Sequence, residues 1–179
     1  LLPATIEYHQ TIGNPFLVVP GFAAARTATR ASWLATANDM NDISVRLAPA
    51  AMRTGYHCHY SDFSPLEASG EYPWDLFFSN TRAEVIMQLD TGNALHAGAD
   101  PAPFLKRYPG RATTVHLKEE SATKPDAVIG EGDVPWPEIF ELCEGPGDTQ
   151  WYIVEQETYP VPPLKAAEMC LRNLKAMGR

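Results

Sequence analysis

Residues 85–90 read Val-Ile-Met-Gln-Leu-Asp, an apolar run of strand length that ends in a carboxylate and is stopped by Thr91-Gly92. Four further runs are rich in β-branched and aromatic residues, and helical patterns lie between them. These runs predict strands over residues 16–19, 53–60, 113–118 and 151–155. Strands that alternate with helices predict an α/β protein with a parallel sheet.

Polar side chains stand within or at the ends of four of these predicted strands. They are His57 and His59, Asp90, His116, and Glu155. Parallel strands bring their carboxyl ends to one face, so these side chains should converge there, as active-site residues do in (β/α)8 barrels. A small doubly wound sheet would also fit five alternating units. However, no GxGxxG follows a strand, which counts against a dinucleotide-binding fold.

Composition limits the classes of function. The 179-residue chain has 45% hydrophobic and 20% charged residues, which is typical of a single globular domain over residues 1–179. A net charge of −8 without a basic run argues against nucleic-acid binding. No apolar run approaches the roughly 18 residues of a membrane helix, so no membrane partner is expected. Three cysteines without CxxC spacing indicate a reducing compartment and a cytoplasmic location.

The strand-end residues have the chemistry of ligands for a divalent metal ion. In His57-Cys58-His59 a strand would point both imidazoles to the same side. Imidazole and carboxylate together suit Mn, Co, Zn, Mg or Fe, and four such ligands leave positions open for a chelating substrate. Each residue also has an ordinary structural role, since histidines occur in cores and Asp90 can cap a turn. Four of them on successive strand ends favour the metal interpretation.

Five motifs stand in a fixed order along the chain, and this order resembles the sugar phosphate isomerase/epimerase family, the xylose isomerase-like TIM barrels. The resemblance covers about residues 3–177. It implies a (β/α)8 barrel of which this chain holds about the last five βα units, with a divalent metal held by Asp90, His116 and Glu155. The motifs are Gly55-Tyr56-His57-Cys58-His59, Leu89-Asp90-Thr91-Gly92-Asn93, Gly110-Arg111 with Val115-His116-Leu117-Lys118, Gly130-Glu131-Gly132-Asp133-Val134 with Trp136, and Ile153-Val154-Glu155-Gln156-Glu157.

The chain departs from the family in its first ligand and in its length. The epimerase branch has a glutamate where this chain has the HxH segment, which resembles the branch of inosose dehydratase-like enzymes. We favour His59 as the fourth ligand, with His57 beside it as an acid/base or as a partner that orients His59. A complete barrel of this type has about 250 residues. The chain is therefore expected to be a fragment that starts inside the third helix, with open sheet edges that favour a homo-oligomer.

The resemblance implies proton abstraction next to a metal-bound keto group of a sugar or polyol, giving isomerisation or epimerisation. Glu155 is the expected general base and His57 the second acid/base, while Lys118 and Glu131 are the expected substrate contacts. Loss of a β-hydroxyl on the same site would make the protein a keto-sugar or inosose dehydratase. Loss of the metal would leave an inactive sugar-binding barrel. An endonuclease-IV-like activity on DNA is disfavoured by the acidic charge.

Overall fold

The computed structural model describes residues 2–179; Leu1, which the sequence assigns to the same domain, lies outside the described residues. The chain forms two compact units, one up to Gln88 and one from Leu89 to Arg179. The expected single domain over residues 1–179 stays a prediction. Among the described residues, no helix combines the length and the apolar character needed to cross a membrane.

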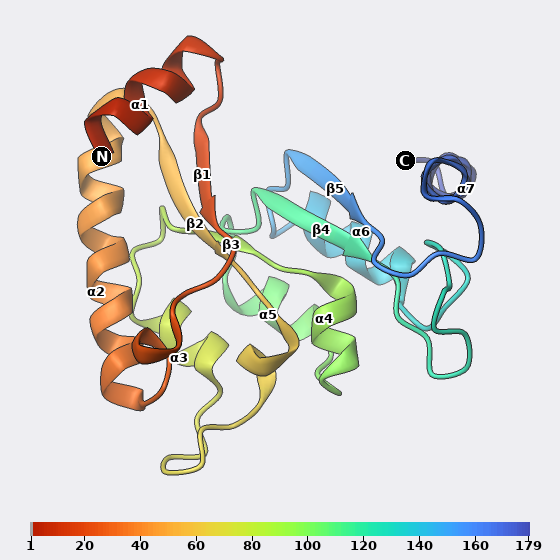
Figure 1. Ribbon diagram of the computed structural model, residues 1–179, viewed down its shortest axis with the longest axis horizontal. Helices are drawn as coiled ribbons and strands as arrows, with labels where there is room; N and C mark the ends of the chain where they lie inside the picture. The colour runs from red at the N-terminus through yellow and green to blue at the C-terminus, as the bar shows by residue number, and fades with distance from the viewer. Residues whose placement is uncertain (1) are drawn as a thin grey trace. The chain divides into compact units, whose positions relative to one another are not determined.

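The first unit is built on a three-stranded parallel sheet in the order β1-β2-β3 (Figure 1). The register pairs Phe16 with Arg53 and Gly55 with Ile86. A side chain at position 55 would place its Cβ 2.6 Å from Ile86 Cβ, so glycine is required for this close approach. The elements are α1 (Leu2–Thr11), β1 (Phe16–Val19), η1 (Ala24–Arg26), α2 (Arg30–Leu47), η2 (Ala48–Ala50), β2 (Arg53–His57), η3 (Tyr60–Phe63), α3 (Pro73–Ser79) and β3 (Ile86–Gln88).

Helix α2 lies alongside β2 and supplies much of this unit's core (Figure 1). It begins with a capping box, in which Thr29 Oγ1 accepts a hydrogen bond from the Ser32 N–H and Ser32 Oγ accepts one from the Thr29 N–H. Its apolar side chains return at helical spacing, and Trp33, Ala37 and Met40 are each at most 2% exposed. Burial of each large apolar side chain contributes about 1.5–3 kcal/mol to stability.

The second unit contains a two-stranded parallel sheet of β4 and β5. Its register pairs His116 with Ile153 and Lys118 with Glu155, and an isolated bridge joins Asp90 to His116. Helix α6 packs against this sheet, where the Phe140 ring meets the Tyr152 ring edge-on at 5.5 Å (Figure 1). The elements are α4 (Thr91–His96), α5 (Ala102–Arg107), β4 (Thr114–Lys118), α6 (Trp136–Glu144), β5 (Trp151–Glu155) and α7 (Pro163–Ala176).

All five predicted strands are present, but three are shorter than the sequence pattern suggested. The strand expected over residues 113–118 begins only one residue later, at Thr114, whereas the other two lose residues at their carboxyl ends. The strand expected over residues 53–60 ends at His57, because Asp62 Oδ2 accepts the His59 N–H and turns the chain into η3. The strand expected over residues 85–90 is Ile86–Gln88, because Asp90 caps helix α4. Both corrections arise where a carboxylate competes for the backbone at a strand's carboxyl end.

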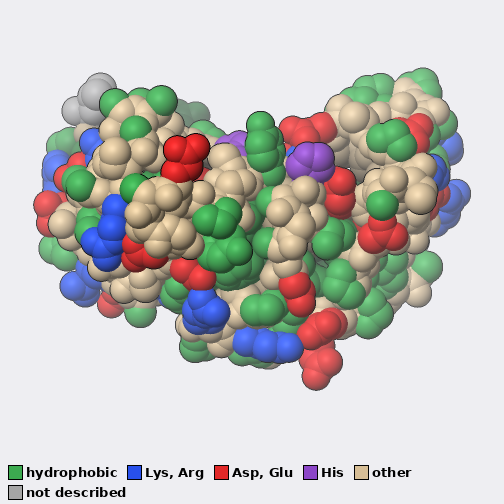
Figure 2. All heavy atoms as spheres, turned by 90° about the horizontal axis from the view of Figure 1, so that it is seen from below, with side chains coloured by type: hydrophobic (Ala, Val, Ile, Leu, Met, Phe, Trp, Pro, Cys, Tyr) green, Lys and Arg blue, Asp and Glu red, His purple; other side chains and the backbone are tan. Residues whose placement is uncertain are grey.

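Charged side chains are interspersed on the face drawn in Figure 2. Lys and Arg lie among Asp, Glu and apolar side chains there, and do not gather into one basic area on this face. The expectation that the chain does not bind nucleic acid stays a prediction, and it rests on the net charge of −8.

Candidate metal centre

Three of the predicted ligands come together in the second unit. His116 lies in β4, Glu155 is the last residue of β5, and Asp90 directly precedes α4. One potential ligand atom of each lies within 4.8 Å of the others. Asp90 and His116 are 26 positions apart in the sequence, and His116 and Glu155 are 39 apart. They nevertheless form one cluster, as the strand-end argument predicted.

The cluster is held by short polar contacts. Nδ1 of His116 lies 2.6 Å from Oε2 of Glu155 and 3.9 Å from Oδ2 of Asp90. The Asp90 side chain is fully buried, whereas the side chains of His116 and Glu155 are 18% and 25% exposed. The cluster is therefore buried at Asp90 and accessible to solvent at His116 and Glu155.

The two carboxylates differ strongly in proton affinity. Burial is the main cause that raises the pKa of Asp90 to about 7, opposed by the hydrogen bond from the Asn93 N–H. The pKa of Glu155 falls to about 2, mainly because of its hydrogen bond with His116 and further because of the Lys118 ammonium. Glu155 is thus ionised at neutral pH, while Asp90 gains or loses its proton there.

Lys118 belongs to the same group of side chains. Its Nζ lies 3.3 Å from Glu155 Oε1 and 3.3 Å from Asn93 Oδ1, and it also contacts the Glu157 carboxylate. The sequence placed Lys118 on the face of His116, and it does lie beside Glu155. Asn93 and Glu157 were missed as members of the group. Sequence spacing could have identified both residues, because Asn93 is three residues after a capping aspartate and Glu157 is two residues after Glu155.

The histidine pair lies in the first unit. His57 is the last residue of β2 and is 6% exposed, whereas His59 follows the strand and is exposed. The two rings meet edge-on with centroids 5.1 Å apart. The alternation argument from the sequence therefore applies only as far as His57, because the chain leaves the extended strand before His59.

The remaining predicted substrate contact, Glu131, is engaged within its own loop. Its carboxylate pairs with Lys124, and this ion pair lowers the pKa of Glu131. Lys124 and Glu131 both lie in the segment that connects β4 to α6. The structure thus gives Glu131 a role in shaping this loop, and its expected contact with substrate stays a prediction.

The donor set of the cluster fits a divalent metal ion. One imidazole nitrogen and two carboxylates within 4.8 Å are ligands that Mn, Fe, Co, Zn and Mg accept in proteins. The fully buried Asp90 carboxylate supports this fit, since a buried carboxylate needs a positive or hydrogen-bonding partner.

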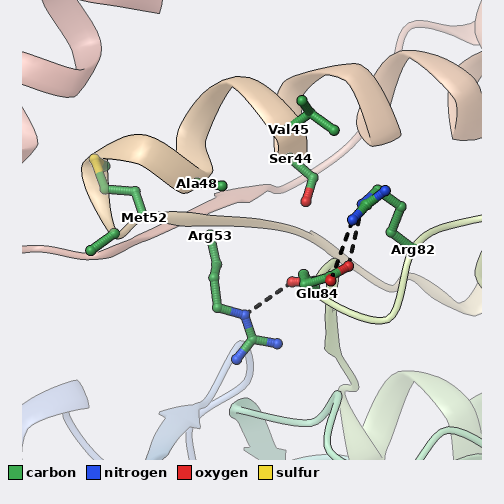
Figure 3. Close-up of a pocket in the computed structure, with 8 residues that line it drawn as sticks. Ser44, Val45, Ala48, Met52, Arg53, Arg82 and Glu84 are labelled. Atoms are coloured by element: carbon green, nitrogen blue, oxygen red, sulfur yellow. Dashed lines mark hydrogen bonds and ion pairs between the residues drawn. The ribbon is translucent and has the colours of Figure 1, made fainter.

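A pocket of the first unit lies at the amino end of β2 (Figure 3). It encloses about 280 Å³ near Arg53, the first residue of β2, and is lined also by Ser44, Arg82 and Glu84. Arg53 Nε donates to the Glu84 carbonyl at 3.0 Å, and Arg82 Nε pairs with the Glu84 carboxylate at 3.3 Å. In parallel barrels the amino ends of the strands serve stability and the carboxyl ends carry the chemistry. We therefore assign this pocket no catalytic role.

Comparison with protein families identifies the class. A model of the xylose isomerase-like TIM barrel matches residues 2–177, so the chain belongs to this family. The predicted barrel fold and the predicted family are both confirmed. The described residues hold five strands, against eight in a complete barrel of this type.

Two similar structures and one curated relative describe this similarity in more detail. Inosose dehydratase 2 of Bacillus cereus is 25% identical over 161 residues, which cover 79% of this chain and 53% of the relative. A sugar phosphate isomerase/epimerase from Parabacteroides distasonis ATCC 8503 superposes with a TM-score of 0.84 at 24% identity, covering 96% of this chain and 60% of that one. The IolI protein, solved with a zinc atom, gives a TM-score of 0.66 at 14% identity, covering 96% and 65%. The chain spans about half the length of the curated relatives it matches.

Proposed function

We propose that this chain carries the metal centre of a divalent-metal-dependent enzyme that isomerises or epimerises a keto-sugar or related polyol. The observation that supports the proposal is the cluster of Asp90, His116 and Glu155, brought together from β4, β5 and the start of α4. Family membership adds support, because relatives are named sugar isomerase/epimerase or inosose dehydratase. The metal is one of Mn, Co, Zn, Mg or Fe.

For the fourth ligand we propose His57, in place of the His59 that the sequence favoured. Barrel enzymes take their active-site residues from the carboxyl ends of strands, and His57 ends β2. His57 is buried, as Asp90 is, whereas His59 lies beyond the strand and is exposed. This choice replaces the role of His57 as second acid/base with that of ligand.

The chain's own side chains supply the remaining chemistry. When bound, the ion acts as a Lewis acid that polarises a carbonyl and favours loss of a proton from the adjacent carbon. Glu155, whose side chain lies at the edge of the cluster that solvent reaches, is the proposed base that takes up that proton. Lys118, with its Nζ 3.3 Å from Glu155 Oε1, is placed to donate a hydrogen bond to a substrate oxygen. Return of that proton by Glu155 to the neighbouring carbon would give an isomer, whereas donation of a proton from solvent to the opposite face would give an epimer.

A dehydratase is the second candidate, because the first relatives by sequence are named inosose dehydratases. The same proton abstraction would be followed by loss of a β-hydroxyl group. An inactive sugar-binding barrel is the third. Deuterium uptake from solvent next to the carbonyl without loss of water would support the isomerase, whereas formation of a conjugated product that absorbs ultraviolet light would support the dehydratase.

The location and assembly of the protein are part of this proposal. Among the described residues, Cys58, Cys143 and Cys170 are buried and none forms a disulfide, which supports a reducing compartment such as the cytoplasm. Association into a homo-oligomer stays a prediction, for which sedimentation of the purified protein over a range of concentrations is the measurement.

Metal analysis tests the proposed function directly. We expect about one divalent ion per chain by mass spectrometry in the purified protein, and less than about a tenth of that in His116→Ala and Glu155→Ala. His57→Ala should lose the ion and His59→Ala should keep it. His96→Ala is the matched control, because His96 is an exposed histidine of the same unit paired with Glu120. Absence of bound metal at saturating Mn, Co, Zn, Mg and Fe would overturn the proposal.

A further inference from the structure

The Lys118 ammonium is a cation built into the candidate metal centre. Lys118 is the last residue of β4, and its side chain is 13% exposed. Its Nζ lies 3.3 Å from Glu155 Oε1 and 3.3 Å from Asn93 Oδ1. A divalent ion and this ammonium would both be attracted to the Glu155 carboxylate, and they would repel each other. The position of Lys118 therefore bears on how tightly the centre holds an ion.

Both oxygens of Glu155 contact side chains of β4. Oε2 lies 2.6 Å from His116 Nδ1, and Oε1 lies 3.3 Å from Lys118 Nζ. His116 belongs to the proposed ligand set, whereas Lys118 does not. Because a carboxylate that ligates an ion shares its negative charge with that ion, the contact with Lys118 is the one that must weaken. The ammonium then needs another negatively charged partner, since a charge in a part-buried position is costly without one.

Glu157 supplies such a partner outside the ligand set. Its carboxylate contacts Lys118 Nζ, and its side chain is 64% exposed. Lys118 thus forms ion pairs with both Glu155 and Glu157. The described side chains that could hold a metal include Glu155, whereas Glu157 is not one of them. One of the two carboxylates is therefore available to the ion, and the other to the lysine.

The backbone and the stem of Lys118 are fixed, which restricts any rearrangement to the end of the side chain. Thr91 Oγ1 donates to the Lys118 carbonyl at 2.8 Å and accepts the Lys118 N–H at 3.1 Å. The stem lies against Gly92, where an added Cβ would be 2.6 Å from Lys118 Cγ and 3.0 Å from Lys118 Cβ. A shift of the ammonium between neighbouring acceptors therefore needs only rotation about the outer bonds of the side chain.

We propose that Glu157 is a positioning residue, which draws the Lys118 ammonium away from Glu155 when a divalent ion binds there. The proposal rests on the proposed function and adds a control of ion affinity to the same centre. An ammonium has three N–H donors, so a Lys118 held by Glu157 and Asn93 keeps one for a substrate oxygen. Without Glu157, Lys118 would stay with Glu155 and compete with the ion.

A double-mutant cycle on ion affinity tests this role. Competition with a chelator would measure the affinity of the whole chain for Mn²⁺ and for Zn²⁺, without any substrate. Glu157→Gln should weaken binding about tenfold in the otherwise wild-type chain, and by less than about twofold in a chain that carries Lys118→Met. The difference is expected because Glu157 acts through Lys118, so its replacement has no effect once the ammonium is gone.

Two further variants separate positioning from a general effect of charge. Glu157→Asp keeps a carboxylate and should restore most of the affinity that Glu157→Gln loses. Glu120→Gln removes the same charge from the segment that follows β4, where the side chain is paired with His96, and it should leave the affinity unchanged. A thermal melt of each variant checks folding, which the exposed position of Glu157 should preserve.

Two results would overturn the role of Glu157. One is a Glu157→Gln chain that binds ions as tightly as the wild type, and the other is an equal loss of affinity with and without Lys118→Met. The second result would mean that the charge of Glu157 attracts the ion directly. Either result in a chain that binds metal overturns this inference and leaves the proposed function standing. A wild-type chain that binds none of Mn, Co, Zn, Mg and Fe would overturn the proposed function, and the role of Glu157 with it.

Discussion

Replacement of Glu119 by glutamine should destabilise the second unit, because this carboxylate organises the loop after β4. Glu119 is 7% exposed and accepts four hydrogen bonds. Its Oε2 takes the Gly130 N–H at 2.6 Å and the Trp136 indole N–H at 2.8 Å. Its Oε1 takes the N–H groups of Val134 and Glu120, each at 3.2 Å. The loop motif from Gly130 to Trp136 thus wraps around one buried carboxylate.

The magnitude follows from this geometry. A glutamine keeps one acceptor oxygen and turns an amide NH₂ toward the two donors on the other side, so at least two hydrogen bonds to a charged group are lost. Each is worth about 1.5–3 kcal/mol. We therefore expect Glu119→Gln to lower the free energy of unfolding by about 3 kcal/mol or more. For a chain of this size that corresponds to a fall in Tm of roughly 6–12 °C.

Urea unfolding followed by circular dichroism and by tryptophan fluorescence measures this loss. Fluorescence is informative because the Trp136 indole donates directly to Glu119. Glu120→Gln is the matched control: its side chain contacts His96 at the surface, and it should change stability by less than about 0.5 kcal/mol. Equal stability of Glu119→Gln and the control would refute the reasoning.

Three further changes have definite expected outcomes. Gly132→Ala should lower Tm in a thermal melt, because its Cβ would lie 2.4 Å from the Glu120 carbonyl oxygen and 2.7 Å from Glu119 Oε1, whereas Gly21→Ala, with open space around its Cβ, should not. Burial raises the pKa of Cys143 from 9.0 to about 11. Stabilisation by the neutral thiol is thus complete below about pH 9 and lost between about pH 9 and 11. The difference in unfolding free energy between wild type and Cys143→Ala should therefore change by on the order of 2 kcal/mol across that window. Urea titrations that give a constant difference would contradict this prediction. Lys118→Met should tighten metal binding about tenfold, because it removes a cation 3.3 Å from Glu155. A chelator competition measures this, with Lys106→Met as the exposed control, and weaker binding would contradict the prediction.

Local patterns in the sequence were sufficient to predict the strands and the cluster of the second unit. In the structure β4 ends at Lys118 and β5 ends at Glu155, which are the residues where the two predicted strands end. Because both strands are parallel and in register, their alternation alone brings His116 and Glu155 to one face. The convergence of Asp90 with them required only the rule that parallel strands share a carboxyl edge.

Sequence reasoning was weakest where side chains redirect the backbone. The extended pattern through His59 gave no sign that Asp62, three residues later, would draw the chain into a turn. The motif around Glu131 drew attention to that exposed carboxylate, whereas the buried acceptor of the loop is Glu119, which stands outside the motif. Interactions of this kind depend on the distance between segments in space, which periodicity does not encode.

The position of Asp90 shows how a helix cap and a ligand can share one residue. Its Oδ1 accepts the Asn93 N–H at 2.6 Å and so starts α4, while its Oδ2 lies 3.9 Å from His116 Nδ1. Because the cap fixes one oxygen of Asp90, the other oxygen of that carboxylate has little freedom. The side-chain oxygen of Asn93 in turn accepts a hydrogen bond from the Lys118 ammonium. The sequence Asp-Thr-Gly-Asn therefore specifies both the helix and the orientation of the buried carboxylate. Burial favours the protonated Asp90 carboxyl, whereas the hydrogen bond from Asn93 opposes this shift, so an ion that competes with that proton is expected to bind more tightly as the pH rises toward about 7.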